Sequence, residues 1–282
     1  MGAMGELSPQ TQWVDSMQGY IKPYWDELLA GPWAEGVAGG KLSLPEMQGW
    51  MLQIYPFIHA FPKFLAEALI KVEDDYSRAF FIGNIRVEKA HAEHWIWMGT
   101  GFGVPREQMI ALADGTKPVL RDVQSLTDWL WYINTKGSLA EAVAATSFAI
   151  EGMAGDIARK VTSGFAHYKD LPGVDLNAKT YKWMKEHALY DDDHPKIAME
   201  IVKRYATTDR MQTRVMLAAK RSLQLLNQAL ITAYQAYTPA VSSTANIDRD
   251  LRGGERRAQQ VVIAFPERRF RERRGHRSRV AA

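Results

Sequence analysis

The chain has 282 residues, of which 46% are hydrophobic, a length and composition typical of a globular protein that buries a sizeable core. It contains no cysteine, which excludes disulfides, thiolate zinc sites, iron–sulfur clusters and a cysteine nucleophile. The net charge of +3 is unevenly distributed, because residues 246–282 carry eleven Arg and five acidic residues and leave residues 1–245 at −3.

The sequence gives no sign of membrane insertion or export. No apolar run approaches the ~20 residues that span a bilayer, and the first residues lack the basic and then apolar pattern of a signal peptide. The lack of cysteine also fits a reducing compartment. We therefore expect a cytoplasmic protein without a membrane partner.

The N-terminal part predicts two long helices. Apolar residues at the spacing i, i+3, i+4 and i+7 favour an amphipathic helix that starts after Ser8 and ends at Gly31-Pro32. The next helix begins near Ser43, a typical N-cap residue. Pro56 and Pro62 are expected to kink or interrupt it.

Further helical patterns fill the rest of the body. They lie near residues 76–100, 105–113, 119–135, 138–164, 176–190, 196–206 and 209–237. We find no alternating strand pattern and no repeat of 20–50 residues. The predicted fold class is an all-α helical bundle.

The sequence changes character after Tyr237. Residues 1–240 are predicted to form the helical domain, and residues 241–282 an Arg-rich tail that is disordered or non-native. Such a tail can bind nucleic acid or an anionic surface electrostatically. Composition favours an appendage of no specific role, so no specific nucleic-acid partner is expected.

An E-x-x-H pair lies in the helix predicted at 76–100. Glu88 and His91 are three residues apart, so both side chains face the same side of the helix. Helical-bundle di-iron proteins use this spacing to bring a carboxylate and an imidazole to one metal pair. His94, one turn further on, could replace His91 or support it.

A lone carboxylate lies in a second, small and apolar helix. Glu151 follows Phe148-Ala149-Ile150 and precedes Gly152. Burying such a carboxylate is costly unless it is paired or binds a cation. The alternatives are a metal ligand or an ion pair with Arg86 or Arg159.

The third candidate stretch is EHALYDDDHP, from Glu186 to Pro195. His187, Asp191 and His194 would share one face if the helix continued through the stretch. Because Pro195 disfavours the helical conformation at the residue before it, we expect a kink between Asp191 and Pro195.

These stretches supply six predicted metal-binding and catalytic residues. They are Glu88, His91, Glu151, His187, Asp191 and His194. Nitrogen and carboxylate ligands without sulfur suit iron or manganese, and six ligands fit two metals with open positions. A single iron held by two His and one carboxylate is the smaller alternative.

Three motifs carry a resemblance to a known family. GNIRVEKAHAEHW, ATSFAIEGMAGD and KWMKEHALYDDDHP resemble the corresponding pieces of the haem-oxygenase-like di-iron oxidases, and are most similar to those of the 1-undecene-forming fatty-acid decarboxylases. The resemblance implies a haem-oxygenase-like helical bundle and the same six residues as metal ligands. One departure is His94, where an aromatic residue is expected.

The resemblance also implies an activity. It suggests a non-haem di-iron enzyme with two Fe(II) ions and O₂ as co-substrate, which converts a medium-chain fatty acid to a terminal alkene. Relatives that act on an amino acid or a nitrogen centre give the alternative. Thiaminase II and the pyrroloquinoline-quinone synthase share the fold but fit less well, since the thiaminase needs a cysteine nucleophile. A homodimer is possible.

The substrate expected from this resemblance is small, apolar and carboxylate-bearing. Aromatic and soft side chains near the proposed ligands could line a channel for it, or could pack the core: Trp50, Tyr55, Phe57, Phe61, Phe64, Trp95, Trp97, Met98, Trp129, Trp131, Tyr132 and Phe148. A second hypothesis, from another class, is a non-catalytic helical binding protein whose Arg-rich tail contacts nucleic acid or a membrane.

Overall fold

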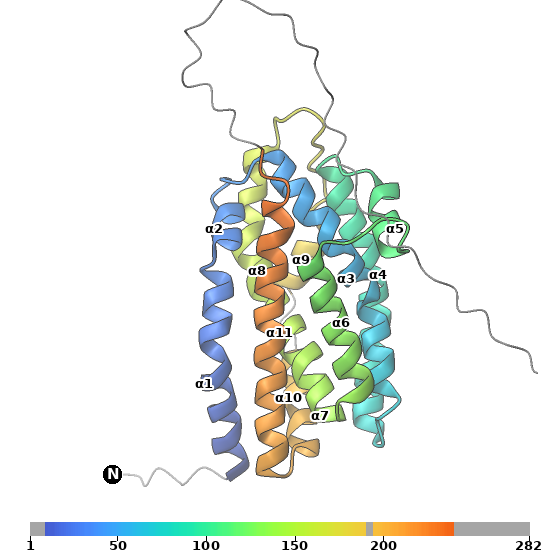
Figure 1. The fold of residues 1–282 in the computed structure, drawn as a ribbon, viewed down its shortest axis with the longest axis vertical. Helices are drawn as coiled ribbons and strands as arrows, with labels where there is room; N and C mark the ends of the chain where they lie inside the picture. The colour runs from blue at the N-terminus through green and yellow to red at the C-terminus, as the bar shows by residue number, and fades with distance from the viewer. Residues whose placement is uncertain (1–8, 190–193, 240–282) are drawn as a thin grey trace, which may run out of the picture. The chain divides into compact units, whose positions relative to one another are not determined.

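The computed structural model describes residues 9–189 and 194–239. Every regular element in these ranges is helical (Figure 1), which confirms the predicted all-α fold class. The Arg-rich tail predicted at 241–282 lies outside the described residues, so the domain boundary at residue 240 stays a prediction.

The helices follow one another closely along the chain. In order they are α1 Pro9–Leu29, α2 Pro32–Ala38, α3 Leu44–Leu69, α4 Asp75–Gly101, α5 Arg106–Ala113, α6 Arg121–Lys136, α7 Leu139–Val143, η1 Ala144–Glu151, α8 Gly152–Val161, η2 Thr162–Tyr168, α9 Lys182–Leu189, α10 His194–Tyr205 and α11 Asp209–Gln235. Here η1 is a π-helix and η2 a 3₁₀-helix.

The long helices lie side by side. In Figure 1, α11 runs between α1 and α6, and it contacts both of them. Helix α3 packs against α4, α6 and α11, and η1 packs against α10 and α11. This arrangement surrounds η1 with other helices, and all eight of its residues are buried.

Side-chain caps fix where several helices begin. Ser43 and Glu46 form a reciprocal capping box at the start of α3, as the sequence indicated for Ser43. Asp74 caps α4 by accepting the backbone N–H of Ser77 at 2.8 Å. Ser138 and Glu141 form a second capping box at the start of α7.

The predictions about prolines hold in part. Helix α3 runs without a break past Pro56 and Pro62, so an interruption at these residues is wrong, while the alternative, a kink, stays a prediction. Pro32 follows the end of the first helix as predicted, but it also occupies the first turn of α2, a short helix that the periodicity did not reveal.

The helix predicted at 138–164 changes its winding three times. It consists of α7, the π-helix η1, α8 and the start of η2. π-helical turns are rare and occur frequently at functional sites. Here the π-helix ends at Glu151, one of the predicted metal ligands.

The segment that carries EHALYDDDHP is divided between two helices. Helix α9 ends at Leu189 and α10 begins at His194, so a single face shared by His187 and His194 on one continuous helix is not formed. Pro195 lies in the first turn of α10, where its missing N–H breaks no intrahelical bond. Asp191 lies outside the described residues.

Candidate metal centre

Three of the predicted ligands meet between α4 and α9. Glu88 and His91 on α4 and His187 on α9 each offer one ligand atom, and these atoms lie within 4.8 Å of one another. All three residues are buried. The spacing of three residues on α4 places the Glu88 and His91 side chains on one face, as the sequence predicted.

The Glu88 and His91 side chains interact directly. His91 Nδ1 lies 3.1 Å from Oε1 of Glu88. Burial lowers the pKa of His91, but the hydrogen bond to Glu88 and the carboxylate charge outweigh it and leave this pKa raised. A metal ion bound here would displace that proton, because an imidazole ligates a metal in its neutral form.

His187 is held as a neutral imidazole. Its Nδ1 donates to the backbone carbonyl of Trp183 at 2.8 Å, and its ring stacks on the Trp183 ring with centroids 3.8 Å apart. Burial, with the positive charge of His91, lowers the pKa of His187 to about 3. Nε2 therefore keeps its lone pair for a ligand, and the Nδ1 bond fixes the direction of the ring.

A close backbone approach helps to place His187. A Cβ added to Gly155 on α8 would lie 3.1 Å from the carbonyl oxygen of His187. The glycine therefore lets α8 pack tightly against α9 at the position of this ligand.

Glu151 forms a second group with His194 and Asn84. Its Oε1 lies 2.7 Å from His194 Nδ1, and its Oε2 accepts a hydrogen bond of 2.8 Å from the Asn84 side-chain amide. The predicted alternatives, ion pairs with Arg86 or Arg159, are not formed: Arg159 pairs with Asp156 instead. The partners of Glu151 are thus a histidine and an amide.

Burial raises the pKa of Glu151 to about 7, and the nearby Glu88 carboxylate adds to this effect. Glu88 and Glu151 therefore bring the negative charge of two carboxylates into one buried pocket, and none of the described residues that line this pocket is a Lys or an Arg. A bound cation would neutralise this charge. The electrostatics of the site therefore fit a metal centre.

The two groups open onto one pocket. Glu88, Glu151 and His187 all line it, and its free volume is about 580 Å³ including its opening to solvent. Its other walls are mainly apolar. The aromatic wall consists of Trp33, Trp50, Phe57, Phe61, Trp95 and Trp183, and the aliphatic wall includes Ile54, Ile58, Ile150, Ile157, Leu226 and Leu230.

The prediction about aromatic side chains holds only in part. Trp50, Phe57, Phe61 and Trp95 line the pocket as expected. The remaining predicted residues do not line it, and Tyr132 is 59% exposed. Among the described residues that form the pocket walls, none is a Lys or an Arg.

Sequence reasoning missed two polar residues of the site. Asn84 precedes Glu88 by four residues on α4, so helical spacing placed it on the same face. Glu186 lies within the third motif, and its Oε2 lies 2.7 Å from Nδ1 of His94. His94 does not replace His91 in the group with Glu88 and His187.

The donor set fits iron. The described predicted ligands are two carboxylates and three imidazoles, without sulfur, on helices α4, η1, α9 and α10. Such nitrogen and oxygen donors suit iron or manganese. His194 is the most exposed of the five, with 28% of its side chain accessible.

Comparison with known proteins assigns the chain to a class. A family described as iron-containing redox enzyme matches residues 48–227, which include Glu88, His91, Glu151, His187 and His194. The chain belongs to this family. No match was found among the curated proteins.

Solved structures share the fold. A TenA homologue from Pseudomonas syringae pv. tomato superposes with a TM-score of 0.71 at 25% identity, over 83% of this chain and 99% of that one. A domain of unknown function with a haem-oxygenase-like fold from Shewanella denitrificans gives 0.64 at 17% identity, over 79% and 93%. The fold is therefore haem-oxygenase-like, as the resemblance implied.

A further TenA homologue, from P. horikoshii, has a TM-score of 0.61 at 14% identity and covers 79% of this chain and 98% of that one. At this identity the likeness concerns the fold. Within the described residues, no helix is both long and apolar enough to span a lipid bilayer.

Proposed function

We propose that the protein is a non-haem di-iron oxidase that uses O₂, and that its metal ligands are Glu88, His91, Glu151, His187, Asp191 and His194. The observation that carries this proposal is the buried set of carboxylates and imidazoles that opens onto a single apolar pocket. When bound, iron would supply the one-electron and O₂ chemistry that side chains alone cannot perform.

The chain's own residues prepare the site for that chemistry. His187 is oriented by Trp183 and stays neutral, so it can act as a ligand near pH 7. Asn84 and His194 hold the Glu151 carboxylate from two sides. The apolar walls exclude water, which strengthens the electrostatic interactions inside the pocket.

The best-supported substrate is a medium-chain fatty acid, converted to a terminal alkene. An alkyl chain matches the aromatic and aliphatic walls. Because the described pocket walls offer no Lys or Arg, the substrate carboxylate would have to bind the metals. Loss of CO₂ and of one β-hydrogen releases two electrons, which O₂ accepts.

A related oxidase that acts on an amino acid or a nitrogen centre is the alternative. An amino acid brings a second charged group, for which the described pocket walls provide only the carboxylates of Glu88 and Glu151. The apolar character of the pocket favours the fatty acid. A non-catalytic binding protein is disfavoured by the membership in a family of redox enzymes.

Iron binding tests the proposal. The apoprotein is loaded with Fe(II) without oxygen, the bound iron is counted, and O₂ is then added while a transient visible absorption is followed. Glu151→Ala and His187→Ala should bind less iron and lose the transient. His59→Ala, which changes a half-buried histidine away from the pocket, is the control. Wild-type iron binding in both site variants would refute a metal centre at these residues.

Product analysis separates the substrate classes. Loaded enzyme is incubated with O₂, a reductant and fatty acids of graded length, and the headspace is searched for alkenes one carbon shorter than the acid. Turnover of an amino acid without alkene formation would support the alternative. Sedimentation of the same sample tests the predicted homodimer.

A further inference from the structure

A second group of potential ligands lies on the outer side of His91. His91 and His94 on α4 and Glu186 on α9 each present a ligand atom, and these atoms lie within 4.8 Å of one another. Glu186 Oε2 is 2.7 Å from His94 Nδ1 and 3.8 Å from His91 Nε2. Two imidazoles and one carboxylate are a donor set that divalent metals accept.

Two atoms of this group contact only each other. His94 Nδ1 and Glu186 Oε2 are buried and lie 2.7 Å apart, and neither has a hydrogen bond to another described residue. A buried imidazole nitrogen and a buried carboxylate oxygen are both ligand atoms for a divalent cation. A cation bound by both would replace their direct contact.

The other oxygen of Glu186 is already engaged. Lys182 Nζ lies 2.7 Å from Oε1, so the carboxylate is held by Lys182 on one side and offers Oε2 on the other. The lysine charge opposes a cation, which limits the affinity of the position. We therefore expect weaker metal binding there than at the buried centre.

His91 stands between the two groups. Its Nδ1 lies 3.1 Å from Glu88, and its Nε2 points toward Glu186. A neutral imidazole has only one unprotonated nitrogen, so once the inner ion takes His91 the outer position keeps His94 and Glu186 as its protein ligands and holds its ion more weakly. The two positions thus share one ligand.

Side-chain exposure increases from the inner group (Glu88, His91 and His187) to the outer group (His91, His94 and Glu186). The side chains of Glu88 and His91 are 8% and 7% exposed, whereas Glu186 is 20% and Lys182 45% exposed. The outer group therefore lies between the surface at Lys182 and the candidate metal centre described above, which we call the inner centre.

From this arrangement we propose that His94 and Glu186, with His91 as the shared ligand, form an outer divalent-cation position that holds a metal ion on its way to the inner centre. The ion is one that accepts nitrogen and oxygen ligands, such as Fe(II) or Mn(II). This position does not depend on the oxidase activity proposed above, since it requires only that the protein takes up a divalent metal.

Manganese titration of the full-length apoprotein tests this position. Free Mn(II) is measured by EPR during titration of the wild type, His94→Phe, Glu186→Gln and the control Glu93→Gln. Glu93 is also on α4 but pairs with Arg106 at the surface. We expect both outer variants to bind about one ion fewer, or to bind it at least about tenfold more weakly, while the tight binding and the control stay unchanged.

The kinetics of uptake provide a second readout. Inner-centre filling, followed as tight Mn(II) binding after mixing, should be several-fold slower in both outer variants and reach the wild-type level. Equal stoichiometry, affinity and uptake rate in all four proteins would overturn the inference. Loss of the tight ion would also overturn it, because His94 or Glu186 would then belong to the inner centre.

Two controls keep these outcomes interpretable. Glu186→Gln preserves the side-chain shape, so it decides the test if His94→Phe does not fold. The variants Glu151→Ala and His187→Ala should instead lose tight binding and keep the weak ion. Failure of the proposed oxidase function therefore gives a result distinct from failure of the outer position.

Discussion

The first residue of α10 contacts the last residue of the π-helix: His194 Nδ1 lies 2.7 Å from Oε1 of Glu151. This contact joins residues 43 positions apart in the chain and brings the third sequence motif to the second one. It also shows how the site is built, since each half takes ligands from a different pair of helices. The inner group uses α4 and α9, and the Glu151 group uses η1 and α10.

Asn84 should tune metal affinity through Glu151. Asn84→Ala removes the amide that donates to Glu151 Oε2, so the carboxylate loses a partner that fixes its orientation. We expect metal affinity to fall about 10–100-fold, the usual effect of removing such a supporting hydrogen bond. Isothermal titration with Mn(II) measures the change.

Asn134→Ala is the matched control for this experiment. Asn134 is equally buried, but it bonds to the Leu130 carbonyl and to Thr146 rather than to a predicted ligand. Both variants should lose stability, and only the Asn84 variant should lose affinity. The same affinity loss in both would mean that the effect arises from general loosening of the bundle.

Leu230 should limit the length of the substrate. Leu230→Phe enlarges a buried side chain of the pocket wall, so the longest accepted fatty acid should become shorter while shorter acids are still converted. Competition between two acids of different length measures the shift. Leu217→Phe, at a position on the same helix that is 52% exposed, should change nothing. A parallel loss for all acids would contradict a role in length selection.

Lowering the pH should destabilise the start of α4, because it protonates Asp74, the N-cap residue of this helix. Hydrogen bonds from the Ser77 backbone and side chain and from Tyr205 lower the pKa of Asp74 to about 2, from an ordinary 3.8. Because the pKa of Asp74 is lower in the folded state than in the unfolded state, the ionised carboxylate stabilises the fold, and this stabilisation is fully present above the ordinary pKa. It is lost as the pH falls from about 4 toward 2.

Asp74→Asn isolates this effect, since asparagine caps a helix nearly as well but carries no charge. The variant should be less stable than the wild type at neutral pH, and the difference should shrink progressively below about pH 4. Urea unfolding at a series of pH values measures it. A difference that stays constant down to pH 2.5, roughly midway in the expected window, would show that the Asp74 charge is not involved.

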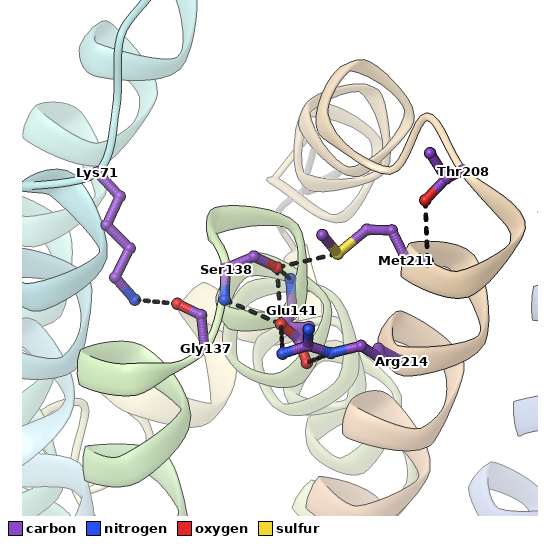
Figure 2. Close-up of polar contacts among 7 residues, drawn as sticks. All are labelled: Lys71, Gly137, Ser138, Glu141, Thr208, Met211 and Arg214. Atoms are coloured by element: carbon purple, nitrogen blue, oxygen red, sulfur yellow. Dashed lines mark hydrogen bonds and ion pairs between the residues drawn. The ribbon is translucent and has the colours of Figure 1, made fainter.

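The start of α7 offers a test of local stability. Figure 2 shows Ser138, Glu141, Arg214 and Met211 joined by hydrogen bonds, with Lys71 bound to the carbonyl of Gly137 beside them. Ser138→Ala should lower the free energy of unfolding by about 1 kcal/mol, the typical value for a lost N-cap. Glu141→Ala should cost more, because it also removes the two hydrogen bonds from Arg214.

Thr208→Ala provides the comparison for these two variants. Thr208 is an exposed N-cap residue. Its side-chain hydroxyl accepts one hydrogen bond, from the Met211 N–H at 3.3 Å (Figure 2), and among the described residues it has no ion-pair partner like Arg214. Urea unfolding should rank the losses as Glu141→Ala, then Ser138→Ala, then Thr208→Ala. If Thr208→Ala were the most costly, the network around Glu141 would not be an important support of this end of the bundle.

Local patterns in the sequence predicted the helical class, most helix positions and the candidate ligands, because amphipathic spacing, capping residues and carboxylates within apolar stretches are local signals. Two elements were not predicted from these signals, the short helix α2 and the π-helix η1. At both, packing rather than hydrophobic periodicity determines the local helix geometry.

The grouping of the candidate ligands depends on how distant helices pack together. Glu151 could have paired with Arg86 or Arg159, and helix spacing contained no information on which helix would lie opposite η1. The fold places His194 and Asn84 there, and it directs His91 toward Glu88 on one side and Glu186 on the other. Contacts between distant helices depend on the packing of the whole bundle, which no short segment specifies.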